Sequence, residues 1–279
     1  MNNKYLISLL TLSSIWIIET NPVQALSVNL YDGSGLPENQ GWLKQGAIQS
    51  SGAPVIPAPT GTVASNGILI DTRIESNSSG NGYFGYSNYN PATSSFINPF
   101  FPTLDRNQGH SIFFDVAVNP SVDTNDNNRA AFSVIAISSD LKGIEIGFDI
   151  DNEIFAQNNN FTSGETANFN IGNNTSYELR IQGNEYQLFA NNNSTPILSN
   201  LLRDYDFDEA NSDPPLTFDP YETPNFLFFG DSTDRASGTF TLGTVSVSTV
   251  PFNFSPTLGL ALIGISIWLR KIYLKKEQS

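Results

Sequence analysis

The stretch GIEIGFDIDNEIFAQ, residues 143–157, alternates apolar and polar side chains up to a turn signal near its middle. Successive side chains of a β-strand point to opposite faces, so the apolar residues at even positions from Ile144 to Ile150 would share one face. The alternation ends at Asn152, and the pair Asp-Asn favours a tight turn. We therefore predict a hairpin with its loop at 151–153, since this register keeps the apolar faces of both strands matched. The predicted cross-strand pairs are Ile150 with Ile154 and Phe148 with Ala156.

Apolar stretches of strand length recur along the chain, each bounded by Gly, Asn, Asp or Ser. Outside the two ends of the chain, only residues 197–205 are compatible with a turn or two of helix. Many short strands with turn signals and almost no helix indicate an all-β sandwich or barrel. The predicted strands are 26–31, 67–74, 111–118, 130–139, 144–150, 176–183, 185–191, 225–230 and 238–250.

The part of the chain between the two ends, residues 26–249, is strongly acidic. It contains 8 Lys and Arg and 25 Asp and Glu, which gives a net charge of 8 − 25 = −17. This charge argues against nucleic acid as a partner, because its phosphates would be repelled. The chain has no cysteine, which excludes disulfides, thiol chemistry and cysteine-ligated zinc. A segment of this length can bury the core of one all-β domain.

Residues 1–25 have the pattern of a secretory signal peptide. Lys4 supplies positive charge, and residues 6–18 form an apolar stretch that is short for a membrane span. Val23 and Ala25 are small residues at the positions where cleavage would need them. The alternative is an uncleaved membrane anchor. We expect residues 26–249 to be exported.

The last 30 residues, 250–279, predict a sorting motif followed by a transmembrane helix and a basic cytoplasmic tail. Residues 252–269 are apolar apart from small polar residues, which is near the minimum length for a membrane span. Four cations follow and predict that the tail stays on the cytoplasmic side. A buried core helix is the alternative. The four cations are Arg270, Lys271, Lys275 and Lys276.

The start of this tail, VPFNFSPTLGL, resembles the V-P-F-E-F-S-P variant of the PEP-CTERM class of bacterial sorting signals. Asn253 stands where the variant has Glu, and there is no Pro-Glu-Pro. The resemblance implies processing by an exosortase-type membrane protease and delivery to the cell surface or beyond it. The matching residues are Pro251, Phe252, Phe254 and Pro256.

Two segments of the central part resemble laminin-G-like and concanavalin-A-like domains. Residues 176–198, SYELRIQGNEYQLFANNNSTPIL, match their strand, turn and strand pattern, and residues 224–247 resemble their closing strands. LYDGSGLPENQGW (30–42) and RAAFSVIAISSDLKGIEIGF (129–148) are similar to a family of exported bacterial proteins of unassigned function with tails of this type. The resemblance implies a concanavalin-A-like jelly roll of two antiparallel sheets over residues 26–249. It implies no activity.

Asp149 and Glu153 are the candidate catalytic carboxylates. Their segment resembles the E-x-D-x-E pattern of concanavalin-A-like glucanases, in which two glutamates on one strand act as nucleophile and general acid/base. Same-face neighbours on a strand lie ~6.6 Å apart and can reach the ~5–5.5 Å carboxyl separation of retaining hydrolases. Here Asp replaces the first glutamate, and the predicted turn takes Glu153 off the strand. A glycoside hydrolase that uses these two residues is therefore an alternative function.

Two acidic or Asn-rich segments are candidate calcium sites, because oxygen atoms recur at alternate positions in each. The first, 123–127, lacks the Gly and Glu of an EF-hand loop. The second, 203–222, reads more readily as a solvated acidic loop than as a site. The candidate metal ligands are Asp123 and Asn125 in the first segment and Asp204, Asp206 and Asp208 in the second.

Aromatic residues are candidates for stacking on a sugar ring. Residues 82–89, GYFGYSNY, hold three tyrosines among Gly and Asn, and in an exposed polar loop these rings would form a stacking surface. A half-buried strand that begins at Tyr83 and Phe84 is the favoured interpretation of the same residues. His110, the single histidine, is expected at the edge of a strand. The candidate ligand-binding residues are Tyr83, Tyr86, Tyr89 and Trp42.

Together these patterns predict an exported protein, tethered to the membrane or sorted to the cell surface, with a non-catalytic domain. We expect the domain to bind polysaccharide of the cell envelope or exopolymer through the concave sheet and its edge loops. Calcium is the one cofactor considered. The alternatives are the glycoside hydrolase described above and a purely structural matrix protein.

Overall fold

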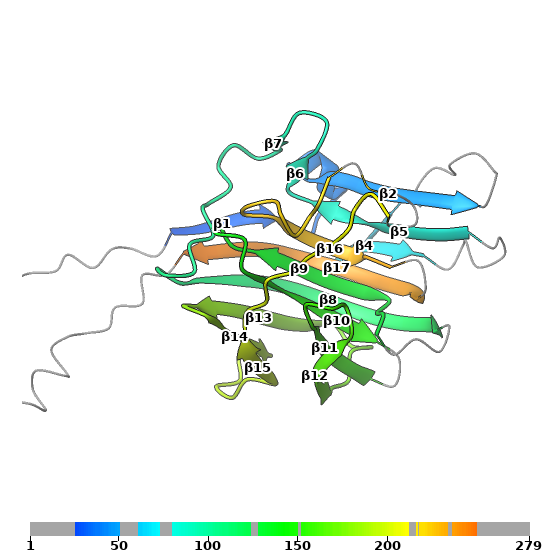
Figure 1. Ribbon diagram of the computed structural model, residues 1–279. Helices are drawn as coiled ribbons and strands as arrows, with labels where there is room; N and C mark the ends of the chain where they lie inside the picture. The colour runs from blue at the N-terminus through cyan, green and yellow to red at the C-terminus, as the bar shows by residue number, and fades with distance from the viewer. Residues whose placement is uncertain are drawn as a thin grey trace, which may run out of the picture. The chain divides into compact units, whose positions relative to one another are not determined.

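The computed structural model describes residues 26–50, 61–72, 80–123, 128–149, 152–211, 216, 218–233 and 236–249 (Figure 1). Within these residues the backbone is mostly extended, and the single helix is the 3-10 helix η1, Pro37–Gln40. The predicted signal peptide, sorting motif and transmembrane helix lie outside the described residues. No helix in the described part of the chain is long and apolar enough to cross a membrane.

The first sheet has eight strands, in the order β15-β14-β13-β8-β17-β4-β3, with β1 beside the end of β17. All of its strand pairs are antiparallel. β8 and β17 are its longest strands and pair with each other near the middle of the sheet. Its strands are β1 Leu26–Tyr31, β3 Thr62–Ala64, β4 Gly67–Asp71, β8 His110–Asp123, β13 Thr175–Gln182, β14 Glu185–Ala190, β15 Leu198–Leu201 and β17 Ala236–Thr249.

The second sheet has seven strands, in the order β12-β11-β10-β9-β16-β5-β2, and is also antiparallel throughout. A separate two-stranded hairpin, β6 and β7, lies between β5 and β8 in the sequence. The strands are β2 Leu43–Ser50, β5 Gly80–Ser87, β6 Tyr89–Asn90, β7 Ser95–Phe96, β9 Phe132–Ile137, β10 Gly143–Asp149, β11 Glu153–Gln157, β12 Ser163–Asn168 and β16 Leu227–Asp231.

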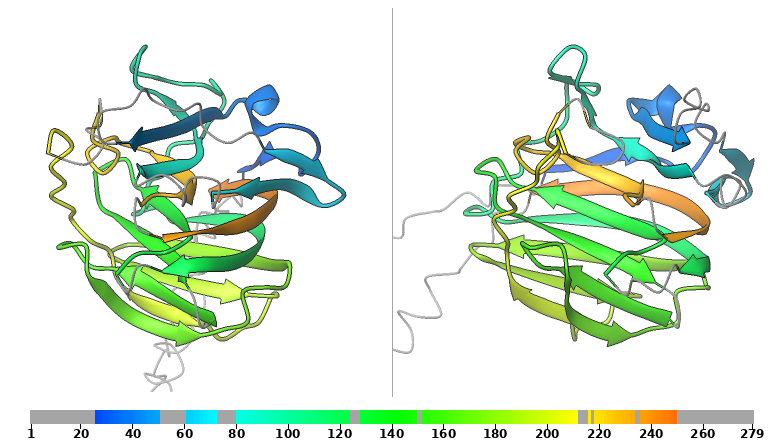
Figure 2. Two further views of the ribbon diagram at one scale, coloured as in Figure 1. Left: turned by 90° about the vertical axis from the view of Figure 1, so that its right-hand side faces the viewer. Right: turned by 45° about the vertical axis from the view of Figure 1, so that its right-hand side comes forward.

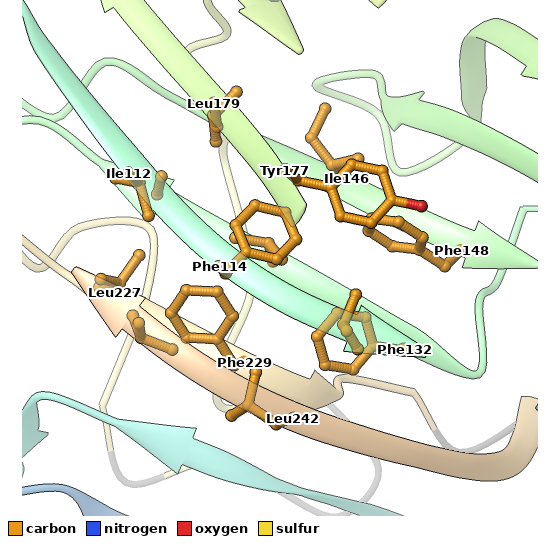
Figure 3. Packing of buried hydrophobic residues seen from close by; sticks show 14 of the residues in the cluster. Ile112, Phe114, Phe132, Ile146, Phe148, Tyr177, Leu179, Leu227, Phe229 and Leu242 are labelled. Carbon is orange, nitrogen blue, oxygen red and sulfur yellow. The ribbon is translucent and has the colours of Figure 1, made fainter. Parts of the chain in front are cut away.

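The two sheets stack face to face, as the two views of Figure 2 show, and the core lies between them. At its centre Phe114 of β8 stacks on Tyr177 of β13 with ring centroids 5.2 Å apart (Figure 3). From the other sheet, Phe148 of β10 and Phe229 of β16 contact the Phe114 ring at 6.3 and 5.5 Å. Full burial of each such side chain contributes roughly 1.5–3 kcal/mol, so this cluster is a major source of stability.

The prediction of an all-β sandwich of two antiparallel sheets, of the jelly-roll type, is confirmed. The helix considered for residues 197–205 is wrong, because Leu198 to Leu201 form β15 instead. Leu198 lies opposite Leu188 and Leu201 opposite Glu185, so β14 supplies hydrogen-bonding partners that a short isolated helix would lack. Short local helical patterns are overridden in this way when a sheet edge is adjacent.

Candidate functional site

The hairpin that holds the two candidate catalytic carboxylates has a different register from the predicted one. Phe148 lies opposite Ile154, and Asp149 lies directly opposite Glu153. The predicted loop at 151–153 is therefore wrong by one residue at each end, and 150–152 connect the strands. Asn152 has φ 58°, a left-handed conformation typical of the last residue of a three-residue hairpin loop. The observed pairing differs from the predicted one by two residues, since Phe148 lies opposite Ile154 and not Ala156. Because side chains alternate between faces with a period of two, this shift leaves every side chain on its predicted face.

This register decides how Asp149 and Glu153 relate to each other. They are cross-strand neighbours at the end of a hairpin, with Asp149 buried and Glu153 half-buried. The same-strand arrangement of the glucanase pattern is therefore wrong for this chain, because Glu153 begins β11 while Asp149 ends β10.

A third carboxylate, Glu145 of β10, lies on the same outward face of the seven-stranded sheet and is buried. The hydroxyl of Tyr221 donates to its Oε2 at 2.6 Å, and the hydroxyl of Ser232 donates to its Oε1 at 2.8 Å. The backbone N–H of Glu145 donates to the hydroxyl of Tyr205 at 3.0 Å. Burial, and then the nearby charge of Glu145, raises the pKa of Tyr221 well above its usual value, so this phenol remains a donor.

These tyrosines belong to a segment that we call the strap, the described residues 203–211, 216 and 218–226. Its start is fixed to the sheet by two backbone hydrogen bonds between Arg203 and Gly143, and by an ion pair of 2.7 Å from Arg203 to Glu165 of β12. Tyr205 donates to the backbone carbonyl of Gln157 in β11 at 2.9 Å. The strap is thus anchored to three neighbouring strands of the seven-stranded sheet.

The aromatic side chains of the strap form a second hydrophobic cluster on the outward face of this sheet. Tyr205 and Tyr221 contact each other with ring centroids 4.7 Å apart. The strap therefore covers the part of the face where Glu145 lies, and a substrate could reach this carboxylate only if the strap moved. The buried residues of the cluster are Ile135, Ile137, Tyr205, Tyr221, Phe226 and Phe228.

Two of the four residues predicted to bind a ligand are in the core instead. Trp42 is buried, donates from Nε1 to the carbonyl of Leu30 at 2.9 Å, and packs edge-on against Phe229. Tyr86 is buried as well, because it shares the inward face of β5 with Phe84. The expectation that Trp42 and Tyr86 offer exposed rings is therefore wrong.

The other two predicted tyrosines have different positions. Tyr89 is half-buried and contacts Phe96 and Phe218 with its ring, at 5.9 and 5.7 Å between centroids. Tyr83 lies in β5 opposite Ala47, and its side chain is outside the described part of the structure. The stretch 82–89 is thus mainly a strand of the sheet and not an exposed tyrosine loop.

The candidate calcium ligands are not brought together in the described residues, which contain no group of three His, Cys, Asp or Glu side chains suited to a metal. Asp204 forms an exposed ion pair of 2.7 Å with Lys142, and Asp208 accepts two hydrogen bonds from Asn211. Asp206 is exposed on the strap. For the first segment, the side chain of Asp123 and the whole of Asn125 lie outside the described residues, so calcium binding there stays a prediction.

An exposed aromatic ring is found instead in the aromatic loop, residues 89–101. Phe100 is 80% exposed. Behind it, the rings of Phe96 and Phe101 stack with centroids 5.7 Å apart and 16° between their planes. The backbone N–H of Phe100 donates to Oδ1 of Asn98 at 2.9 Å, and that of Phe101 donates to the Asn98 carbonyl at 3.1 Å. A turn with these bonds presents the Phe100 ring to solvent in a fixed place.

A polar network lies on the neighbouring loop, residues 32–41. Gly41 has φ 88°, and a Cβ there would lie 3.3 Å from Cβ of Asn98, so this loop touches the aromatic loop. The exposed carboxylate of Asp32 accepts from the Ser34 hydroxyl at 2.7 Å and from Nε2 of Gln40 at 2.8 Å. The bond from Ser34 is the main cause that lowers the pKa of Asp32. An exposed ring on one loop and fixed polar groups on the loop that contacts it suit a ligand with both apolar faces and hydroxyls.

Sequence reasoning missed Phe100, although a signal for it was present. Residues 98–103 read NPFFPT, so two phenylalanines lie between two prolines. Proline fixes the backbone and disfavours pairing within a sheet, which keeps such a segment on the surface. Large apolar residues in a loop of this kind are candidates for exposed rings.

Comparisons with known proteins give no family for this chain. No protein-family model and no curated protein matches it. Among solved structures, the carbohydrate esterase vb_24B_21 from Shiga toxin-encoding bacteriophage phi24B is 12% identical, over 80% of this chain and 99% of that chain, with a TM-score of 0.49.

Two further solved structures are also similar to the chain. The winged bean acidic lectin in complex with methyl-α-D-galactose is 10% identical, over 81% of this chain and 98% of that chain, with a TM-score of 0.37. The exoplasmic/lumenal domain of VIP36, bound to Ca²⁺ and Man2, is 10% identical, over 84% of this chain and 91% of that chain, with a TM-score of 0.38. These likenesses concern the arrangement of strands and carry no information on what this chain binds.

Proposed function

We propose that the protein is a non-catalytic module that binds polysaccharide at the outer surface of the cell, with Phe100 as the ring on which a sugar stacks. The observation that carries this proposal is the 80% exposure of Phe100 on a loop held by the Phe96–Phe101 stack. A single exposed apolar side chain is common on protein surfaces, but a ring that is held in a fixed place by its loop is available for stacking on a ligand. The apolar face of a pyranose fits such a ring, and the sugar hydroxyls need polar partners at its side.

The Asp32–Ser34–Gln40 network supplies polar groups of this kind on the adjacent loop. The net charge of −17 over residues 26–249 favours neutral sugars over acidic ones, because a polyanionic chain would be repelled. The ligand class that best fits the loops is therefore a polysaccharide without acidic groups.

The strap supports a function without catalysis. It covers Glu145, whose two carboxylate oxygens already accept hydrogen bonds, one from Tyr221 of the strap and one from Ser232 after β16. A hydrolase needs two carboxylates that reach the substrate from an open site, at a separation set by the mechanism. The proposal of surface location rests on the sequence patterns of residues 1–25 and 250–279, which also suggest processing of the tail by an exosortase-type protease.

A glycan array with the wild-type protein and three variants tests this function. Stacking on one ring contributes roughly 0.5–1.5 kcal/mol, so Phe100→Ala should weaken binding about three- to tenfold, and Phe100→Trp should retain or strengthen it. Val63→Ala is the matched control, because Val63 is 53% exposed in β3 and does not belong to the aromatic loop. The array is run with calcium and with a chelator to examine the predicted ion.

Absence of binding to any glycan in both conditions would refute the proposed function. Binding that Phe100→Ala and Val63→Ala weaken equally would refute the role of Phe100. Release of reducing sugar from a bound polysaccharide, lost in Asp149→Asn, would show a hydrolase instead.

A further inference from the structure

The outward face of the eight-stranded sheet carries an exposed ring at its centre. Phe113 of β8 is 36% exposed and points away from the core, since its neighbours Ile112 and Phe114 are buried on the inward face. It lies between Glu178 of β13 and Ser246 of β17, which are directly opposite it. The ring is thus surrounded by polar side chains on both adjacent strands.

Two residues further along β8, Asp115 is on the same face and is held by a hydroxyl on each side. Ser176 of β13 donates to its Oδ1 and Thr244 of β17 donates to its Oδ2, both at 2.5 Å. Thr244 reaches Asp115 because the pairing of β17 with β8 is irregular between Leu242 and Val245. Gly243 allows this close approach, since a Cβ there would lie 2.9 Å from Cβ of Asp115.

These hydrogen bonds leave Asp115, Ser176 and Thr244 with acceptor atoms only. Each hydroxyl uses its one hydrogen on the carboxylate, so only oxygen lone pairs remain for a ligand. Asp115 makes no ion pair with any described residue. The group is therefore a negatively charged acceptor site that is suited to a cation with several N–H donors.

Glu178, the other carboxylate beside Phe113, differs in this respect. Arg180 binds both of its oxygens at 3.0 Å, and Ser111 donates to one of them at 2.7 Å. The guanidinium of Arg180 lies over the Phe189 ring at 4.5 Å, which holds it in this position. Glu178 is therefore neutralised within the protein, whereas the charge of Asp115 remains available.

We propose that this face binds a polysaccharide with free amino groups, such as a glucosamine polymer. The ammonium group of one sugar would donate to Asp115 and its two hydroxyls, and a sugar ring would lie against Phe113. Residues i and i+2 on a strand are about 6.6 Å apart, which is compatible with one sugar contacting both side chains. This site is on a different part of the fold from Phe100, and the proposal does not depend on that residue.

The chemistry favours an amino sugar over a lysine-rich peptide. A lysine ammonium can reach Asp115 from many directions on its flexible chain and gains nothing specific from the ring. A rigid amino sugar presents its cation and its apolar face at a fixed distance, so that both Phe113 and Asp115 contribute. Dependence of binding on both residues is therefore the signature of the sugar.

Isothermal titration calorimetry on the purified protein at low salt provides the test. Glucosamine oligomers should bind at least about tenfold more tightly than N-acetylated oligomers of the same length, because acetylation removes the charge and the donors. Asp115→Asn should weaken binding of the free-amine oligomers about tenfold, and Phe113→Ala about three- to tenfold. Asp208→Asn is the control: it makes the same change in net charge at an exposed position on the strap.

Several results would overturn the proposal. These are equal affinity for the acetylated and free-amine oligomers, no effect of Asp115→Asn relative to Asp208→Asn, and no binding at all. An oligolysine that binds as tightly, with no effect of Phe113→Ala, would show a general cation site instead. Phe100→Ala should leave binding of the free-amine oligomers unchanged. This result distinguishes binding at Phe113 and Asp115 from binding at Phe100. Melting temperatures of the variants show whether each is folded.

Discussion

Lowering the pH from 7 to 4 should destabilise the protein through its single histidine, His110. Although its position at the start of β8 predicted a strand edge, the side chain is fully buried, and neither ring nitrogen has a hydrogen-bond partner among the described residues. Burial lowers the pKa of His110 from 6.5 to about 4, with the backbone of Asp105, and then its charge, acting in the opposite direction. The imidazole is therefore neutral in the folded protein at any pH above about 4.

The magnitude follows from the difference between the folded and unfolded pKa values. That difference is 6.5 − 4, or 2.5 units, and each unit corresponds to about 1.4 kcal/mol, so His110 can contribute about 3 kcal/mol. Between pH 6.5 and 4 the unfolded chain binds a proton that the folded chain excludes. The free energy of unfolding is thus unaffected by His110 above pH 6.5 and falls progressively as the pH approaches 4.

Urea denaturation of the wild type and of His110→Leu at intervals between pH 4 and 7.5 measures this effect. Carboxylates also titrate near the lower limit, but they are common to both proteins and cancel in the difference. The stability of the wild type relative to the variant should fall by about 3 kcal/mol between pH 6.5 and 4. Because the chain has one histidine, its imidazole resonance also reports the folded pKa directly by NMR.

A difference between the two proteins that stays constant over this pH range would refute the reasoning. An imidazole resonance that titrates near 6.5 in the folded protein would do the same, because it would mean that the ring is solvated. A wild type that becomes more stable relative to His110→Leu as the pH falls would require a buried anion next to the ring.

Three further predictions concern the free energy of unfolding, measured by urea denaturation at pH 7. Phe114→Ala should cost about 3–5 kcal/mol, because it opens a cavity at the centre of the core, and a loss under 1 kcal/mol would mean that the sheets collapse around it. Tyr221→Phe should lower the free energy of unfolding by about 1–3 kcal/mol, because it removes a hydrogen-bond donor to the buried Glu145. Tyr177→Phe should be neutral or stabilising, because the Tyr177 hydroxyl has no partner among the described residues. Equal effects of the two changes would contradict this account. Gly230→Ala should lower the free energy of unfolding by at least about 1–3 kcal/mol, because Gly230 has φ 154° and a Cβ there would lie 2.4 Å from backbone atoms of β5. A variant that unfolds at the same urea concentration as the wild type would contradict this geometry.

The all-β fold could be predicted from the sequence because its strands have a two-residue period. In the hairpin of β10 and β11, the parity of the apolar residues placed Phe148 and Ile154 on the core face, and both are buried there. Parity cannot distinguish registers that differ by two residues, so the predicted pairing of Phe148 with Ala156 was wrong. Asn152 has the left-handed conformation that Asn tolerates in turns, but the sequence alone does not tell whether it is the middle or the last residue of the loop.

The candidate sites were harder to predict, because local composition does not tell which residues the tertiary structure buries. Tyr86 and Trp42 have neighbours typical of loops and yet lie in the core. The alternating pattern of its strand predicts that Glu145 is exposed. In the structure it is covered by the strap, which is distant in sequence, and the Tyr221 hydroxyl donates a hydrogen bond to it. Asp115 acquires its two hydroxyl donors from strands that are distant in sequence, Ser176 in β13 and Thr244 in β17.

The pairing of β1 with β17 has a consequence for the order in which the domain can form. Ser27 lies opposite Ser248, so the first and last strands of the described chain are neighbours, and β17 also separates β8 from β4. A chain that emerges gradually from a ribosome or a translocation pore cannot complete the eight-stranded sheet until its final strand is available. Contacts this distant in sequence slow folding, and they leave strand edges exposed meanwhile. Joining the adjacent ends and opening the chain at the 183–184 turn would give a circular permutant in which β17 is synthesised before β8. The last strand of that chain would be β13, which lies between β14 and β8, so completion of the sheet would then wait for β13 instead of β17.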